Sequence, residues 1–317
     1  MSTVDEVILL GGERMPALME HVEGLLAQTS GTGGPDLHAP ASDTLAAGGK
    51  RLRPLLVLIC GGAQDEDPLV RAAAAVELIH MATLVHDDVV DDALLRRGRP
   101  TVFARDGRET AAATGDFLFS RSFALLAANG DPEQVRVLSD ACLALARGEL
   151  AQRHDAYRLD VDEQRYTLRC ELKTASLFAA ACMLGALAAG RPAAETGALE
   201  SYGRRLGLAF QLLDDVLDVS GPEERTGKHR GTDLLDGTVT LPLILADLGL
   251  SDLRTVTTRE DAEALCDRIA ATGALDETRK RATALVSEAK DALRGNVDAG
   301  LERSLTDVAD RIAERYA

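Results

Sequence analysis

Residues 72–92 read AAAAVELIHMATLVHDDVVDD, a long apolar run that ends in four aspartates. The run contains no Gly or Pro and no strict alternation of apolar and polar residues, so it predicts a helix rather than a strand. Its apolar residues cover more than one helix face, and residues 173–189 have the same character. Helices of this kind belong at the centre of a large bundle. We therefore expect an all-α protein.

The aspartates at the end of this run lie in an unfavourable place for negative charge. The helix dipole favours anions at the N-terminus, and like charges three or four residues apart repel each other. A capping role is therefore excluded for most of them, and either a solvated surface or a cation site remains. Asp87 and Asp91 fall on one helix face about one turn apart, with His80 on the same stripe two turns earlier. Two carboxylates on one face suit a hard divalent ion, above all Mg²⁺.

A second cluster repeats the spacing. QLLDDVLD, residues 211–218, places Asp214, Asp215 and Asp218 after another apolar run. One DDxxD motif alone is as consistent with a surface patch as with a site. Two copies, each at the end of an apolar helix, favour metal ions held between facing helices, and a diphosphate is the natural bridging ligand.

Cationic residues accompany both clusters. GGKRLRPLL carries Lys50, Arg51 and Arg53, RRGRP carries Arg96 and Arg97, KTASLF carries Lys173 and Thr174, and Lys228 follows the second cluster. Singly, each is most simply a surface cation with its stem packed on apolar neighbours. As a set they suit diphosphate, because Arg contacts phosphate oxygens in pairs and Lys supplies a point charge.

The rest of the chain predicts further helices, separated by Gly- and Pro-rich breaks at 30–40, 61–68, 97–100, 129–132, 190–192 and 220–231. No repeat or long linker interrupts residues 1–317, so we expect one domain. The expected helices cover residues 14–28, 42–62, 68–92, 107–128, 132–155, 162–189, 193–219, 238–247, 259–271, 275–295 and 300–316.

The net charge and the cysteine content limit the binding partners and the cellular compartment that we expect. The 35 Lys and Arg against 51 Asp and Glu give a formal charge of −16, which opposes nucleic acid and anionic lipid headgroups. The five cysteines are odd in number and form no CxxC pair, which suits a reducing compartment. The N-terminus has no basic region typical of a signal peptide, and no uncharged apolar run reaches ~18 residues. We expect a cytoplasmic protein without stable membrane insertion.

The motifs GGKRLRP, LIHMATLVHDDVVDD, RRGRPTV, GDFL, LKTASLF, GLAFQLLDDVLD and GTDLLDGTVTLP occur in this order over roughly residues 42–247. The chain thereby resembles the trans-isoprenyl diphosphate synthases, and among them the bacterial long-chain polyprenyl diphosphate synthases. The resemblance implies an isoprenoid synthase bundle around a deep central cavity. It also implies a prenyltransferase that repeatedly condenses isopentenyl diphosphate with an allylic diphosphate, and a homodimer.

The resemblance also assigns residues. Metal ligands would be Asp87, Asp91, Asp214 and Asp218, with Asp88 and Asp215 supporting catalysis, and they would hold three Mg²⁺ ions for which Mn²⁺ can substitute. Isopentenyl diphosphate would contact Lys50, Arg53, His80 and Arg97. The allylic diphosphate would contact Arg96, Lys173, Thr174, Gln211 and Lys228, with Lys173 also catalytic.

The loop after the second cluster departs from the family pattern. The usual GKPxG is GKHRG here, with His229 and Arg230, and a second lysine often seen later in the loop is replaced by Thr238. The cations that close over the allylic diphosphate are therefore rearranged, and Arg230 is a candidate substitute.

Product length is expected to depend on Ala82 and Thr83, which lie ~6–7.5 Å before Asp87 along the helix axis. Short-chain members of the family commonly place an aromatic residue there. Two small residues leave the tunnel open, so we expect a product of about six isoprene units or more, limited deeper by Val76, Ile79 or Phe123. Thr83 lies on the same helix face as Asp87, whereas the assignment of Ala82 rests on the family comparison. In the simplest alternative, both residues are small only because close helix packing requires it.

Three other functions stay open. A shorter-chain synthase, making geranylgeranyl or geranylfarnesyl diphosphate, would share every motif. A terpene cyclase would carry an Asn/Ser/Glu metal motif in place of DDVLD and would lack GGKRLRP. A non-catalytic partner subunit would have eroded aspartate motifs, and both are intact here.

Overall fold

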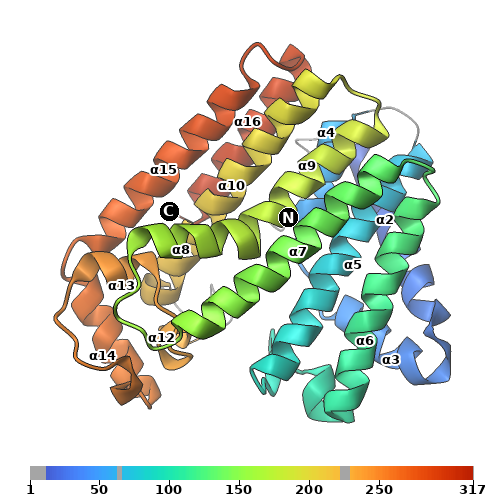
Figure 1. Ribbon diagram of the computed structural model, residues 1–317. Helices are drawn as coiled ribbons and strands as arrows, with labels where there is room; N and C mark the ends of the chain where they lie inside the picture. Colours follow the sequence, from blue (N-terminus) through green and yellow to red (C-terminus); the bar gives the residue numbers. More distant parts are fainter. Residues whose placement is uncertain (1–11, 63–65, 222–228, 317) are drawn as a thin grey trace. The chain divides into compact units, whose positions relative to one another are not determined.

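The computed structural model describes residues 12–62, 66–221 and 229–316, and helices make up nearly all of this part of the chain (Figure 1). The all-α expectation is confirmed. In the described ranges the strands are β1 (Leu95–Arg96) and β2 (Arg99–Pro100), a short antiparallel pair. The first elements are α2 (Met15–Ser30), η1 (Gly31–Gly33), α3 (Gly34–Ala46), α4 (Leu52–Gly61), α5 (Glu66–Val90), α6 (Val102–Ala127) and α7 (Pro132–Asp155).

The second half of the chain continues with helices of varied length. They are α8 (Glu163–Cys170), η2 (Glu171–Ala175), α9 (Ser176–Ala188), α10 (Ala193–Ser220), α12 (Thr232–Leu235), α13 (Leu241–Ala246), η3 (Leu253–Thr255), α14 (Arg259–Ala270), α15 (Ala274–Leu293) and α16 (Ala299–Tyr316).

The chain forms two compact units. Unit 1 comprises Met1–Cys142, Ala180–Glu200 and Asn296–Ser304, and unit 2 comprises Leu143–Ala179, Ser201–Gly295 and Leu305–Ala317. In unit 1, α5 packs against α6, α4 and α2, and nearly every residue from Leu69 to Ala82 is buried. The sequence predicted this central position from the apolar faces of the segment. In unit 2, α13 packs against α15, α14 and α8.

Several expected boundaries differ from the structure. The Gly/Pro-rich stretch 30–40 was expected to break the chain, but α3 begins at Gly34 because Pro35 fits the first helical turn. The break falls instead between α3 and α4, where Gly48 and Arg51 have left-handed backbone angles (φ 76° and 46°). The prediction of one continuous helix over residues 42–62 was therefore wrong.

Two other expected helices also differ from the structure. The segment 162–189 is α8, η2 and α9, with a π-helical turn in the middle. The helix expected from 107 begins earlier, at Val102, because the Thr101 hydroxyl caps it by accepting from the Ala104 N–H at 3.0 Å. Gly107 lies inside it with φ 88°, which explains the apparent start there.

Two helical stretches, Glu66–Val90 and Glu163–Ala188, are long and apolar enough to cross a membrane by length and composition alone. About 72% and 67% of their apolar windows are buried inside the protein. Core helices of soluble proteins have this character.

Candidate active site

The first aspartate cluster lies at the C-terminal end of α5, as the sequence predicted. Asp87 is half-buried and Asp91 is exposed just beyond the helix, where its N–H donates to the Asp87 carbonyl at 2.8 Å. Asp88 is buried and accepts from Arg96 Nε at 2.7 Å. Burial raises the pKa of Asp88, the Arg96 guanidinium opposes this rise, and the Asp91 carboxylate adds to it. Asp88 is therefore held in an ion pair, whereas Asp91 lies at the surface.

A hairpin that the sequence reasoning missed positions the two arginines after this cluster. Arg96 pairs with Arg99 across β1 and β2, and the two residues between them, Arg97 and Gly98, both have positive φ (53° and 73°). Two central residues with positive φ are typical of a tight hairpin turn. The signal available in the sequence was the Arg-Gly pair at the centre of LRRGRP, since strands of two residues show no periodicity.

A cavity of about 230 Å³ in unit 1 gathers these cations. His80, Asp88, Arg96 and Arg97 line it, while Lys50, Arg53, Asp87 and Asp91 do not. The apolar part of its wall includes Met81, Leu84 and Val85 from α5. Arg51, which the sequence had placed among the cations, lines it as well. The sequence did not identify the remaining charged groups of the wall, which are Asp43, Glu77, Arg99 and Arg105.

Arg51 ties the GGKRLRP segment to two helices. Its Nε donates to Glu23 Oε1 at 2.5 Å, and its Nη1 donates to Glu77 Oε1 at 2.8 Å. Glu77 is almost fully buried in α5, so this ion pair neutralises a core carboxylate. Burial lowers the pKa of Arg53 to about 10, and Glu77 opposes the fall. Arg53 therefore remains charged at neutral pH.

His80 is neutral in this environment. Burial lowers its pKa well below the usual value, and Arg53, Arg97, Arg96 and Arg51 lower it further by charge repulsion. A neutral imidazole can donate one hydrogen bond to an anion in the cavity.

In unit 2 the second cluster separates into members with different environments. Asp215 is only 2% exposed; it accepts from the Tyr166 hydroxyl at 2.5 Å and from Gln211 Nε2 at 2.8 Å. Thr174 Oγ1 donates in turn to Gln211 Oε1 at 2.7 Å. Burial raises the pKa of Asp215 to about 7, and the Asp233 carboxylate contributes to the rise. Asp214, by contrast, is exposed.

Lys173 and Thr174 lie in the π-helical turn η2, a distortion that often marks functional sites. Lys173 Nζ is 2.5 Å from Glu149 Oε2 on α7. A Cβ at Gly148 would lie 2.7 Å from the Lys173 N, so a glycine is needed for α7 to approach this turn so closely.

A second cavity, of about 170 Å³, collects these groups. Lys173, Thr174, Gln211 and Asp215 line it, as expected for a shared site. Thr238, which the sequence had singled out in the loop, also lines the cavity. The rest of the wall was not predicted from the sequence and consists of Gln152, Tyr166, Arg169, Cys170, Asp233 and Thr240.

The loop after the second cluster folds back onto it. The Gly231 N–H donates to the Asp218 carbonyl at 2.8 Å, and the Asp233 N–H contacts Asp218 Oδ2 at 3.3 Å. Asp233 is thus a further acidic residue of this site that the sequence reasoning missed. The signal was the acidic residue in GTDLL, but the fold of the loop was needed to bring it there.

The same loop contains the two expected cations Lys228 and Arg230. Lys228 lies outside the described residues. Arg230 donates to Asp267 Oδ1 at 2.8 Å and to the Val219 carbonyl at 2.9 Å, and it does not line the cavity. These contacts give no support to Arg230 as the substitute cation.

The residues expected to set product length lie on α5. Ala82 is completely buried, and Thr83 is partly buried with its hydroxyl donating to the His80 carbonyl at 2.8 Å. Ile79 and Val76, one and two turns earlier, are also fully buried.

The next question is whether the aspartates of the two clusters fit the coordination of Mg²⁺. Across the described ranges, no group of three or more His, Cys, Asp or Glu side chains is arranged to hold a metal ion. Asp87 and Asp91, one turn apart, offer paired carboxylate oxygens to one side of an ion. Mg²⁺ typically binds one or two carboxylates and completes its shell with water and substrate phosphates, so the donor set fits.

Known proteins resemble this chain over most of its length. Residues 35–263 match the sequence model of the Polyprenyl synthetase family. A heptaprenyl diphosphate synthase component 2 from Geobacillus stearothermophilus is 49% identical over 212 residues, which are 66% of this chain and 65% of that protein. Its counterpart from Bacillus subtilis is 35% identical over 302 residues, 93% of this chain and 87% of that protein.

Other relatives make shorter or longer products. A geranylgeranyl diphosphate synthase from Methanosarcina mazei is 35% identical over 88% of this chain and 90% of its own. The crystal structure of a decaprenyl diphosphate synthase from Rhodobacter capsulatus matches with a TM-score of 0.89 at 32% identity, covering 99% of both chains. By sequence and by fold, the chain therefore belongs to the polyprenyl synthetase family of prenyltransferases.

Proposed function

We propose that this protein is an all-trans polyprenyl diphosphate synthase that adds isopentenyl diphosphate repeatedly to an allylic diphosphate. The observation that carries the proposal is a pair of cavities in a chain of this family. Each cavity is lined both by cationic side chains and by an aspartate of one of the two motifs. We propose further that residues 1–317 act as one synthase domain around a deep central cavity, since the family match runs through both units.

The unit 1 cavity is proposed to hold isopentenyl diphosphate. His80 and Arg97 line it directly, and Lys50 and Arg53 come from the adjoining GGKRLRP segment. The guanidinium groups would contact phosphate oxygens in pairs, and the neutral His80 would donate one hydrogen bond. The apolar side chains of Met81, Leu84 and Val85 suit a short isoprenoid chain.

The unit 2 cavity is proposed to hold the allylic diphosphate. Lys173, Thr174 and Gln211 line it, and Asp215 fixes the Gln211 amide by accepting its hydrogen bond. Arg96 and Lys228 are proposed to join this site, as the family resemblance implies.

The family is generally magnesium-dependent. Asp87, Asp91, Asp214 and Asp218 are the proposed ligands of three ions, with Asp88 supporting the first pair, and Mn²⁺ can substitute. Bound magnesium would neutralise the allylic diphosphate and make it a better leaving group.

The chain's own residues then support ionisation and coupling. Arg96, Lys173 and Lys228 share the negative charge that develops on the diphosphate as the allylic carbon–oxygen bond breaks. The allylic cation needs a pocket that excludes water, because water would convert it to an alcohol. The double bond of isopentenyl diphosphate forms the new carbon–carbon bond, and the released diphosphate takes the proton that leaves. The product is one isoprene unit longer and re-enters the cycle.

We propose a long-chain product, since two small residues stand at Ala82 and Thr83 and the heptaprenyl and decaprenyl synthases are among the similar proteins. A geranylgeranyl or geranylfarnesyl synthase is the second candidate, because a geranylgeranyl synthase matches almost as much of the chain. Family members are soluble enzymes, and we propose the cytoplasm as the compartment.

The assignment of the two substrates to two cavities can be tested by substrate sorting. Arg53→Ala is expected to raise the KM for isopentenyl diphosphate by about tenfold or more, with little change for the allylic primer, because a charge-assisted contact is lost at one site only. Lys173→Ala is expected to do the reverse. Steady-state kinetics with each substrate varied in turn measures both. Equal effects on both substrates from both variants would show that the sites are misassigned.

A further inference from the structure

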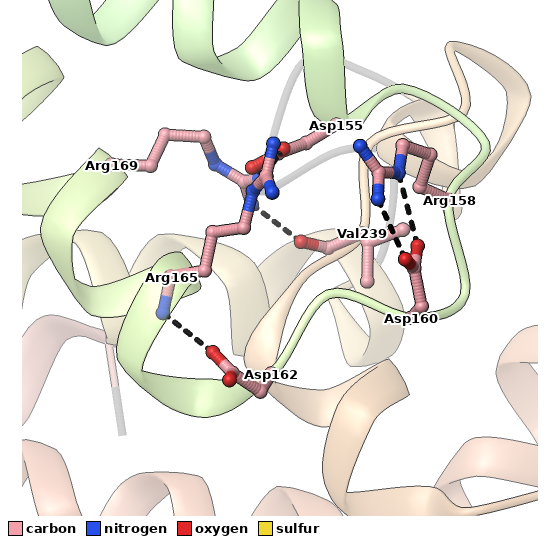
Figure 2. Close-up of polar contacts among 7 residues, drawn as sticks. All are labelled: Asp155, Arg158, Asp160, Asp162, Arg165, Arg169 and Val239. Atoms are coloured by element: carbon pink, nitrogen blue, oxygen red, sulfur yellow. Dashed lines mark hydrogen bonds and ion pairs between the residues drawn. The ribbon is translucent and has the colours of Figure 1, made fainter.

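Arg169, which lines the unit 2 cavity, belongs to a cluster of ionic contacts with Asp155 and Arg165 (Figure 2). Asp155, the last residue of α7, is fully buried; its Oδ1 accepts from Arg165 Nε at 2.5 Å, and its Oδ2 contacts Arg169 Nη1 at 3.4 Å. Figure 2 shows both guanidinium groups converging on this one carboxylate. Arg169 Nη2 also donates to the Val239 carbonyl.

The charges in this cluster do not balance. Two arginines share Asp155, and the closer one, Arg165, has a side chain that is 45% exposed and therefore hydrated. The side chain of Arg169 is 4% exposed and has only the longer contact to the carboxylate. A buried cation is costly unless an anion compensates it. Asp155, Arg165 and Arg169 together thus carry one more positive than negative charge, and Arg169 is the less exposed of the two cations.

Arg169 faces the cavity together with Lys173. It precedes Lys173 by four residues, on α8 just before η2, and both side chains line the same space. Among the described residues, its hydrogen bonds to Val239 and Asp155 engage two of the five N–H donors of a guanidinium. The remaining donors form a fork that suits two phosphate oxygens.

In the described part of the loop, residues 229–240, no lysine or arginine lines the same cavity, and the one charged lining residue is Asp233. Thr238, which replaces a lysine often seen in the family, lines the cavity, and the carbonyl of the neighbouring Val239 accepts a hydrogen bond from Arg169. The Tyr157 N–H fixes the loop from the other side by donating to the Gly237 carbonyl at 2.7 Å. Arg169 is therefore connected directly to the segment from which a cation is missing.

We propose that Arg169 binds the diphosphate of the allylic substrate as a second cation beside Lys173, and that Asp155 positions it. The proposal rests on the proposed function of the unit 2 cavity. Arg169 supplies from α8 the charge that Thr238 does not supply from the loop, and bound diphosphate compensates the surplus positive charge of the cluster.

The test compares two substitutions that each remove one arginine from Asp155. Binding of a non-ionising thio analogue of farnesyl diphosphate, with Mg²⁺, is measured by calorimetry on the full chain. Arg169→Gln is expected to weaken binding by about tenfold or more, since charge-assisted hydrogen bonds to the diphosphate are lost. Arg165→Gln, the matched control, is expected to stay within about twofold, because a half-exposed ion pair contributes little.

A rescue separates charge supply from structural support. Thr238→Lys, introduced into Arg169→Gln, is expected to restore most of the affinity, because it returns a cation to the same cavity from the loop. Arg169→Lys keeps the buried charge and loses the forked geometry, so it is expected to bind about three- to tenfold more weakly than the unsubstituted protein. If Arg169→Gln does not fold, Arg169→Lys serves as the test in its place. Unchanged affinity of Arg169→Lys for the analogue would contradict the proposed contact.

Equal weakening by Arg169→Gln and Arg165→Gln, or no rescue by Thr238→Lys, would overturn the proposal and leave Arg169 a structural residue. The proposed function is judged separately, by elongation of the primer. Analogue binding that depends on Arg169 without elongation would reject that function alone. Elongation with normal binding by Arg169→Gln would reject the role of Arg169 alone.

Discussion

At the residue scale, His80 connects the charge of the unit 1 cavity to pH. The charged groups around it are Arg51, Arg53, Glu77, Asp88, Arg96 and Arg97. Because the pKa of His80 is lowered in the folded protein, the unfolded chain takes up a proton at higher pH than the folded one. The resulting stabilisation is complete above the unfolded pKa of about 6.5 and is lost as the pH falls below it.

The free energy of unfolding should therefore fall more steeply from pH 7.5 to 5.5 in the unsubstituted protein than in His80→Gln. The difference is expected to be about 1 kcal/mol, since one group contributes at most about 1.4 kcal/mol per pH unit. Urea unfolding at the two pH values measures it. His154→Gln, at an exposed position on α7, is the control and should behave like the parent. An identical pH dependence in His80→Gln and the parent would show that His80 is not held neutral.

At the scale of elements, we propose that α5 determines whether a tunnel for the growing product stays open. Thr83→Phe should shorten the product, because an aromatic ring would fill the space alongside the face of Asp87. Product lengths with farnesyl diphosphate as primer measure this, and Thr83→Val, close to threonine in size, is the control. Ala82→Phe is less informative, since Ala82 is completely buried and overpacking typically costs about 1–3 kcal/mol. An unchanged distribution in Thr83→Phe would mean that the chain does not pass this residue.

The sequence predicted these elements unevenly, for physical reasons. The central position of α5 and the placement of Asp87 at its end followed from helical periodicity, which extends over many residues. The β1–β2 hairpin was missed because two-residue strands have no period. The role of Arg51 was also missed, since its partners Glu23 and Glu77 are far away in sequence and meet it only after folding.

At the scale of the whole molecule, exposed leucines on α7 suggest how two copies would associate. The α7 residues Leu143 and Leu150, two turns apart, are 60% and 61% exposed, and an apolar stripe of this kind suits a helix-to-helix interface. We expect a homodimer that Leu150→Glu converts to a monomer, as measured by light scattering. Arg147→Gln, between the two leucines, is the control, because it also lowers the net charge by one and leaves both leucines in place. A monomeric parent protein would contradict this and would favour a second, different subunit, as in the two-component heptaprenyl synthases.

The most direct test of the central claim is the length of the product. The purified chain is incubated with Mg²⁺, labelled isopentenyl diphosphate and farnesyl diphosphate, and the products are separated by length. We predict all-trans diphosphates of about six isoprene units or more, formed without a second protein and abolished by chelation of the metal. A cyclic hydrocarbon, or no elongation of the primer, would contradict the synthase assignment, and accumulation at four units would contradict the long-chain product.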